Sequence, residues 1–309
     1  MALLSLAVLD VRSAWADEAF ITDQQGDAIT VVDLATNANV ATIAVEGLPA
    51  GIAMSQDGLT AYVTSPDAHS LSVIDTADRT VTRRILLGGE PLGVAVSAAG
   101  LVYVADWISS RVLVVDPLAG RVLGEIAVGH SPSGLAISPD GGLLVCADRL
   151  DNQLSLISLP DNTVIGTVPV GQHPFGVAID SRRRAFVADV DSQEVSVVDL
   201  ATHRLLGRVS TGPRPYVVAL SQDHGFVTNE LGGSVTVFDL RTLAVSATID
   251  VGAYPEGIQV DRRGRAYVVN WMDDTVSVLD ERSLVVSGEI KVGASPRAFG
   301  TFIRSTPTP

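Results

Sequence analysis

A unit of about 40 residues recurs along this chain of 309 residues and constrains its fold more than any other feature. One anchor of the repeat is a proline that follows a Val-Gly-like pair, at Pro49, Pro91, Pro132, Pro174, Pro215, Pro255 and Pro296. A second anchor ends a Val-x-Val-like run, at Asp33, Asp75, Asp116, Ser158, Asp199, Asp239 and Asp280. Both series advance by 40 to 42 residues. Such agreement indicates seven copies of one supersecondary unit.

Each unit contains four short apolar runs separated by turn signals. In one unit the runs are 93–97, 101–105, 111–116 and 121–127, and Gly, Pro, Ser and Asp lie between them. Runs of this length bounded by turn residues are typical of antiparallel strands. Four strands in each unit describe one blade of a β-propeller. We therefore predict an all-β fold, a seven-bladed β-propeller of four-stranded antiparallel blades.

The register of the repeat also predicts how the ring closes. The chain enters at 18–22 on a second strand that has no first strand before it. It leaves at 297–303 on a first strand that has no second strand after it. Strand exchange between the termini would complete one blade from these two halves and would protect a sheet edge. We expect one propeller domain over 17–303 and a flexible tail over 304–309.

The first residues have the pattern of an export signal. Residues 2–9 form a short apolar segment, and Ala14-Trp15-Ala16 has the small-x-small pattern that a signal peptidase reads. We expect 1–16 to be a signal peptide and Asp17 to begin the mature chain. The mature protein would then be periplasmic or extracellular. The alternative is a strand-like N-terminal segment that stays on the protein.

The repeat resembles a known propeller family. Residues 61–64 (Ala-Tyr-Val-Thr), 71–76 and 91–97 together resemble the YVTN-type β-propeller repeat, and the likeness covers nearly the whole mature chain. The fourth unit departs from the pattern, with Val145 and Ser158 in place of the usual residues. The resemblance implies an exported binding or accessory protein. Its relatives include surface-layer proteins and propellers encoded beside quinoprotein dehydrogenases, and its distant relatives include lactonases and lyases.

Charge and composition exclude several classes of partner. The net charge is −14, from 35 acidic and 21 basic residues, so the chain lacks the basic surface that nucleic-acid binding needs. No apolar run approaches the roughly 18 residues of a membrane-spanning helix. Cys146 is the only cysteine, which excludes an intrachain disulfide and a CxxCH haem attachment. We expect no nucleic-acid partner, no membrane span, no cofactor and a monomeric protein.

One polar position ends the second strand of every unit. Its residues are Asp23, Ser65, Asp106, Asp148, Asp189, Asn229 and Asn270. Short polar side chains at such positions usually cap the turn by bonding nearby backbone N–H groups. A ring of carboxylates that binds a cation is the alternative. The loops that follow this position should open on one face of the propeller, together with the loops between blades.

The residues that vary on this upper face are the candidates for recognition, because the repeat does not demand them. The set comprises Glu90, Trp107, His173, Arg214, Tyr216, Glu230, Tyr254, Glu256, Trp271 and Arg297. Arginines would pair with anionic groups, glutamates with cationic groups, and the aromatic side chains would supply apolar contact. Solvated rim residues that merely cover neighbouring blades are the alternative interpretation.

Catalytic motifs are scarce. The five histidines include no HExxH pair, and the chain has no Gly-x-Ser-x-Gly elbow and no P-loop. A divalent metal held by His173, Asp189 and Glu230 is a weak candidate. The favoured function is binding of a small molecule or a protein partner on the upper face around the channel. The alternative is a periplasmic metal-assisted hydrolase or lyase, or an accessory subunit of a quinoprotein dehydrogenase.

Overall fold

The computed structural model describes residues 17–305, and the predicted signal peptide and the last four residues lie outside this range. The first blades contain β1 (Glu18–Asp23), β2 (Ala28–Asp33), β3 (Ala38–Ala44), β4 (Gly51–Met54), β5 (Thr60–Ser65), β6 (Ser70–Asp75), β7 (Thr80–Leu86), β8 (Pro91–Val96), β9 (Val102–Asp106), β10 (Arg111–Asp116), β11 (Arg121–Ala127), β12 (Pro132–Ile137), β13 (Leu143–Asp148), β14 (Gln153–Ser158) and β15 (Thr163–Pro169). The remaining strands are β16 (Pro174–Ile179), β17 (Arg184–Asp189), β18 (Glu194–Asp199), β19 (Arg204–Ser210), β20 (Pro215–Leu220), β21 (His224–Asn229), β22 (Ser234–Asp239), β23 (Val245–Asp250), β24 (Pro255–Val260), β25 (Arg265–Asn270), β26 (Thr275–Asp280), β27 (Val285–Lys291), β28 (Phe299–Thr301) and β29 (Ile303–Arg304).

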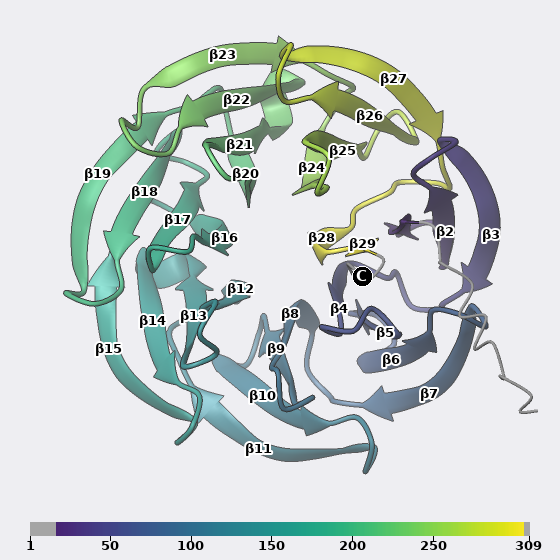
Figure 1. The fold of residues 1–309 in the computed structure, drawn as a ribbon. Coiled ribbons are helices and arrows are strands. Elements are labelled where there is room, and N and C mark those ends of the chain that lie inside the picture. Colours follow the sequence, from purple (N-terminus) through teal and green to yellow (C-terminus); the bar gives the residue numbers. More distant parts are fainter. Residues whose placement is uncertain (1–16, 306–309) are drawn as a thin grey trace, which may run out of the picture.

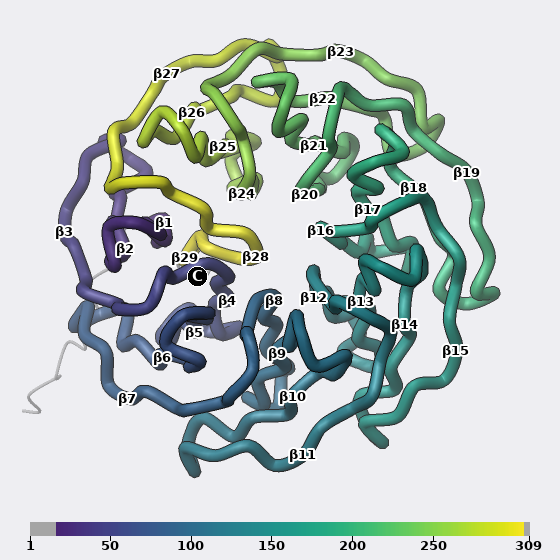
Figure 2. The backbone as a smooth tube through the Cα atoms, turned by 180° about the vertical axis from the view of Figure 1, so that it is seen from behind, coloured from purple at the N-terminus to yellow at the C-terminus, as the bar shows by residue number. Residues whose placement is uncertain are grey.

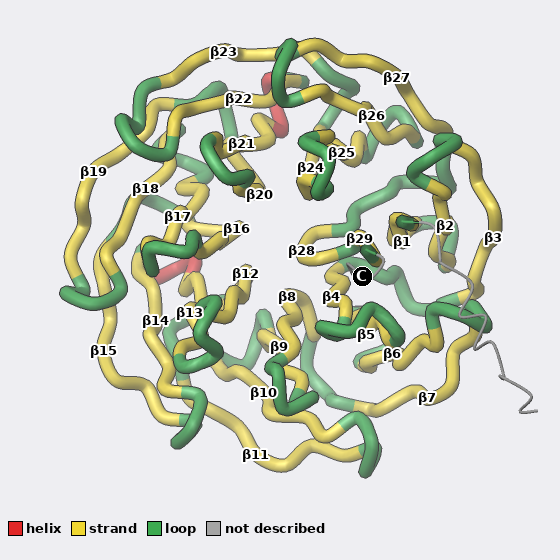
Figure 3. Tube along the Cα trace, in the orientation of Figure 1, coloured by secondary structure: helices red, strands yellow, loops and turns green. Residues whose placement is uncertain are grey.

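The strands form seven sheets arranged in a ring, as predicted (Figure 1). Within a blade the strands run antiparallel in sequence order, for example β12-β13-β14-β15. The first strand of each blade lines the centre, and the fourth runs along the outer circumference. Almost all of the described chain is strand or loop, with short 3-10 turns at η1 (Arg149–Asp151) and η2 (Glu230–Gly232) (Figure 3). Among residues 17–305 no helix is long and apolar enough to cross a membrane.

Apolar layers between adjacent blades hold the ring together. The aromatic position that recurs near the start of the second strand is buried in these layers, for example at Phe20, Tyr103 and Phe186, each at most 2% exposed. Tyr103 of β9 packs in one cluster with Cys146 of the next blade, whose side chain is also buried. Burial of large side chains between blades is the main favourable term for such a fold. Each blade is therefore stabilised chiefly by its neighbours.

The two ends of the described chain meet in one blade (Figure 2). Strand β29 pairs antiparallel with β1, with Glu18 opposite Arg304. The strand expected over 297–303 is interrupted, because β28 instead pairs in parallel with β4 of the neighbouring blade. Gly300 lies in β28 at φ 120°, in a conformation that favours glycine. The terminal segment thus contacts two blades instead of one, and its last strand includes Arg304, which we assigned to the tail.

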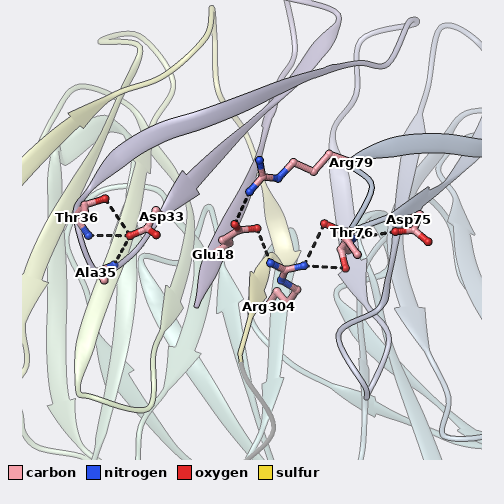
Figure 4. Close-up of polar contacts among 9 residues, drawn as sticks. Glu18, Asp33, Ala35, Thr36, Asp75, Thr76, Arg79 and Arg304 are labelled. Atoms are coloured by element: carbon pink, nitrogen blue, oxygen red, sulfur yellow. Dashed lines mark hydrogen bonds and ion pairs between the residues drawn. The ribbon is translucent and has the colours of Figure 1, made fainter. Parts of the chain in front are cut away.

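A buried ion pair fastens this closure (Figure 4). Nη2 of Arg304 donates to Oε2 of Glu18 at 2.8 Å, and both side chains are 6% exposed. Nη2 of Arg79, from the turn before β7, donates to the other carboxylate oxygen of Glu18 at 2.7 Å. Nη1 of Arg304 donates to the backbone oxygen of Thr76 at 3.1 Å. One carboxylate therefore connects β1, β29 and the next blade.

Candidate ligand-binding site at the channel mouth

The loops that follow the second strands and the loops between blades meet around a pocket on one face of the ring. The pocket has a volume of about 340 Å³. Five of the predicted recognition residues line it: Glu90, Trp107, Arg214, Tyr216 and Arg297. Glu90 and Trp107 come from the β8–β11 blade, Arg214 and Tyr216 from the start of the β20–β23 blade, and Arg297 from the closing segment, so the pocket exists only in the closed ring. The structure therefore brings half of the predicted set into one place.

Aromatic side chains form the floor of the pocket. The rings of Phe175 and Tyr216 are stacked with centroids 4.0 Å apart, and Trp107 lies 6.4 Å from Phe175. On its other side Phe175 meets Phe299 edge-on at 5.6 Å. Phe299 in turn lines a second cavity of about 440 Å³, surrounded by the innermost strands, with apolar side chains such as Ile258. The aromatic layer thus lies between a charged pocket and an apolar channel.

Arg297 is held in the wall by two buried partners. Its Nε donates to Oε2 of Glu256 at 2.6 Å, and its Nη2 donates to the hydroxyl of Tyr216 at 2.9 Å. Burial opposes the charge of Arg297, yet contacts with Tyr216 and Glu256 raise its pKa. Burial also raises the pKa of the Tyr216 hydroxyl. This network keeps Arg297 charged and fixes the orientation of the Tyr216 ring.

A second ion pair lies on the neighbouring blade. Nε of Arg214 lies 2.7 Å from Oε2 of Glu230, in ion-pair contact but without the alignment of a hydrogen bond. Glu230 begins the 3-10 turn η2 and is 7% exposed. Burial raises the pKa of Glu230, and the charge of Arg214 opposes that shift. The Arg214 side chain is 41% exposed, so its other nitrogen atoms remain accessible from the pocket.

Arg149 differs from both of these arginines. It begins the 3-10 turn η1, lines the pocket and lies over the Trp107 ring, with its guanidinium carbon 5.8 Å from the ring centroid. Within residues 17–305 no carboxylate lies within ion-pair distance of it. Burial lowers the pKa of Arg149, and the charge of Arg214 acts in the same direction. The pocket therefore contains a partly buried guanidinium without a paired acid.

Two carboxylates also line the pocket. Asp67 and Glu90 line the pocket, and both residues are exposed. Glu90 is fixed through its backbone, because its N–H donates to Asp106 at 3.0 Å and its carbonyl accepts from the N–H of Trp107 at 2.9 Å. The lining thus contains both arginines and solvated carboxylates, which come from different loops.

The remaining predicted residues lie beside the pocket. Glu230 and Glu256 act as partners of its arginines. Tyr254 and Trp271 pack on each other at the rim with centroids 6.2 Å apart. Nε1 of Trp271 donates to Oε1 of Gln24, a lining residue, at 3.4 Å. His173 is paired through Nδ1 with Asp191 at 2.6 Å.

Sequence reasoning missed the two residues that distinguish this site most. Phe175 follows a repeat proline, and the variation at that position could have found it. Arg149 follows Asp148, which is equivalent to the place of Trp107 after Asp106. Trp107, Glu230 and Trp271 follow the polar ring and belong to the predicted set, and an arginine at the same position is equally outside the repeat pattern.

The polar ring that ends the second strands is buried and structural. Asp23 accepts from the Thr30 hydroxyl at 2.6 Å and from the N–H of Gly293 at 3.1 Å. Asn229 and Asn270 donate to hydroxyl groups of their own third strands. In these blades the ring position joins the second strand to the third strand, and Asp23 also to the incoming loop. The position is structural, but its partners are third-strand hydroxyls and the loop between blades instead of the N–H groups of its own turn, which the sequence interpretation had favoured.

Close packing against the polar ring explains the glycine of the Val-Gly-like pair. A Cβ atom on Gly171 would lie 2.6 Å from Cβ of Asp189, closer than two carbon atoms can approach. The loop between blades can therefore approach the buried ring this closely only at a glycine.

Burial raises the pKa of Asp189 to about 7 and that of Asp23 to about 6, against the opposing effect of nearby hydrogen-bond donors.

The three candidate metal ligands have separate partners. His173 pairs with Asp191, Glu230 pairs with Arg214, and Asp189 lies buried beside Ser196 and Gly171. In the described part of the chain, no group of three or more His, Cys, Asp or Glu side chains is arranged to hold a metal ion.

Comparison with known proteins supports the fold. No family model and no curated protein matches the chain. A functionally unknown protein from Desulfotomaculum acetoxidans has a TM-score of 0.78 at 16% identity, over 92% of this chain and 99% of its own. Kuenenia stuttgartiensis hydrazine synthase has a TM-score of 0.75 at 19% identity, over 84% and 91%. Dihydro-heme d1 dehydrogenase NirN, in complex with DHE, has a TM-score of 0.70 at 17% identity, over 94% and 77%. At these identities the likeness shows a β-propeller fold alone.

Proposed function

We propose that this protein is an exported binding protein that recognises a small molecule in the pocket at the channel mouth. The observation that carries the proposal is the contrast between a regular scaffold and an irregular site. The equivalent positions beside the repeat prolines hold Leu92, Phe175, Tyr216 and Arg297, so each blade contributes different chemistry. A concave site with an aromatic floor and few oriented charges is typical of ligand recognition.

Export and membership of the YVTN-type repeat family complete the proposal. The small-x-small pattern before Asp17 and the repeat of about 40 residues support them. Cleavage before Asp17 would leave the described propeller intact, because its first strand begins at Glu18. N-terminal sequencing of the protein recovered from the periplasm or medium of an expressing bacterium tests this part. Recovery of uncleaved protein from the cytoplasm alone would contradict it.

The binding site itself is tested by filling it. Leu92 lines the pocket and is 9% exposed, so Leu92→Trp places a larger side chain over the aromatic floor. A small-molecule library is screened by thermal shift and ligand-observed NMR against the unmodified protein. We expect compounds that bind the unmodified protein to lose at least about tenfold in affinity with Leu92→Trp, a loss of roughly 1.4 kcal/mol.

Leu118→Trp is the matched control. Leu118 lies in the turn between β10 and β11 and is 90% exposed, so the same side chain there leaves the pocket open. Ligands should bind this variant as they bind the unmodified protein. The unliganded melting temperatures of both variants report whether they fold. Unchanged binding to folded Leu92→Trp would place the site elsewhere and contradict the proposal.

A further inference from the structure

We infer that the pocket at the channel mouth recognises a small aromatic molecule that carries one anionic group, which Arg149 binds. This inference rests on the proposed function and specifies its ligand. It has three supports: an unpaired guanidinium, a stacked aromatic floor and solvated carboxylates elsewhere in the lining.

The guanidinium is the first support. Arg214 and Arg297 already have carboxylate partners at 2.7 and 2.6 Å, whereas Arg149 has none within ion-pair distance among residues 17–305. A partly buried cation without a partner is costly, and an anion that binds it forms charge-assisted hydrogen bonds. The guanidinium carbon of Arg149 lies 5.8 Å from the centroid of the Trp107 ring, and this cation–π contact restricts the side chain before a ligand binds. Arg214, whose outer nitrogen atoms are accessible, is the second donor group.

The floor is the second support. The stacked pair of Phe175 and Tyr216 lines the pocket with only 2% and 6% of its surface exposed, and Trp107 lies tilted against Phe175. The Tyr216 hydroxyl accepts a hydrogen bond from Nη2 of Arg297, which fixes the orientation of its ring. A flat apolar ligand would add a third ring to this arrangement, and offset or edge-on ring contacts are favourable beyond the area that they bury.

The acidic lining is the third support and limits the ligand to one anionic group. Asp67 and Glu90 lie on the pocket away from any ion-pair partner in the described chain, and both are solvated. A second anionic group directed toward them would meet like charges, in addition to the field of a protein with net charge −14. The site should therefore prefer a monoanion to a dianion on the same ring.

Three probes that share one ring system separate the contributions of the guanidinium, the aromatic floor and the acidic lining. They are 2-naphthoate, its neutral amide 2-naphthamide, and naphthalene-2,6-dicarboxylate, each titrated by calorimetry into the full-length protein. We expect 2-naphthoate to bind at least about tenfold tighter than the amide, and the dianion to bind more weakly than the monoanion. Arg149→Gln should weaken 2-naphthoate about tenfold and leave the amide unchanged. The unchanged amide also shows that the aromatic floor of the variant is intact.

Arg121→Gln, at the exposed start of β11, is the control for loss of a positive charge and should leave all three affinities unchanged. Equal affinity for 2-naphthoate and its amide would overturn the inference. So would binding of 2-naphthoate that Arg149→Gln does not alter, or failure of all three probes to bind. In those cases a library compound that binds the unmodified protein and loses affinity with Leu92→Trp would still support the pocket as a binding site. Failure of this inference is therefore distinguishable from failure of the proposed function.

Discussion

Asp189 shows how one residue in a repeat can hold an unusual charge state. It occupies the same ring position as Asn229 and Asn270, which make neutral hydrogen bonds in their blades. In the described chain no donor is well aligned with either carboxylate oxygen of Asp189. Burial raises its pKa to about 7, so the folded protein keeps this carboxyl neutral in mildly acidic solution. The position demands a short polar side chain and no charge.

The Asp189→Asn variant should therefore gain stability over the unmodified protein as pH rises. The pKa of Asp189 is about 7 in the folded protein and 3.8 for an unperturbed aspartate, so the unfolded chain ionises first. The stabilising effect of the neutral form is full below the unfolded pKa and is lost as pH rises through the folded value. The free-energy difference between variant and parent should grow between these pH values by up to about 1.4 kcal/mol per pH unit.

Urea denaturation at a series of pH values measures this difference. Asp199→Asn is the control of opposite sign, because backbone hydrogen bonds from Ala201 and Thr202 lower the pKa of Asp199. Its contribution is present above the unfolded pKa and is lost as pH falls. A pH-independent difference for Asp189→Asn would contradict the raised pKa.

Residue-level chemistry was only partly predictable from sequence. Arg214, Arg297 and Tyr216 could be selected from the sequence because the repeat does not require these residue types at their positions. Their pairing with Glu230 and Glu256 could not be foreseen, because it depends on side-chain directions across neighbouring blades. Pairing also decides which cation is free for a ligand, and for this reason only the structure shows that Arg149 has no paired carboxylate among residues 17–305.

At the scale of elements, the closing strands are the feature with the clearest energetic consequence. Glu18 of β1 accepts hydrogen bonds from Arg304 and Arg79, and its side chain is 6% exposed. Removing one partner of a buried ion pair leaves an uncompensated buried charge. Glu18→Gln should therefore lower the free energy of unfolding by about 3 kcal/mol. Chemical denaturation of the purified variant measures the loss.

Glu46→Gln provides the exposed comparison. Oε2 of Glu46 lies 3.1 Å from Nη1 of Arg84, and the Glu46 side chain is 76% exposed. Surface ion pairs of this kind contribute at most about 1 kcal/mol. Equal effects of the two substitutions would show that the closing pair contributes little to the stability of the ring.

The whole molecule was the scale at which sequence was most informative. Regular spacing of prolines and strand ends predicted the number of blades and their strand order, because each blade must repeat the same interblade layer. The register at 18–22 and 297–303 predicted the closing blade. The parallel pairing of β28 with β4 could not be predicted, because it arises where Gly300, at a φ of 120°, interrupts the strand that the repeat pattern predicts over 297–303.

Ring closure by an antiparallel terminal pair means that the starting point of the chain is arbitrary. Since Glu18 stands opposite Arg304, a hairpin linker of a few residues could join the two ends, and the chain could be reopened elsewhere. We expect a circular permutant with new ends after Leu118, in an exposed turn, to fold and to keep its binding affinities. Calorimetry with the same probes compares it with the parent. A folded permutant with altered affinities would mean that the ends of the chain, and not only the closed ring, shape the pocket.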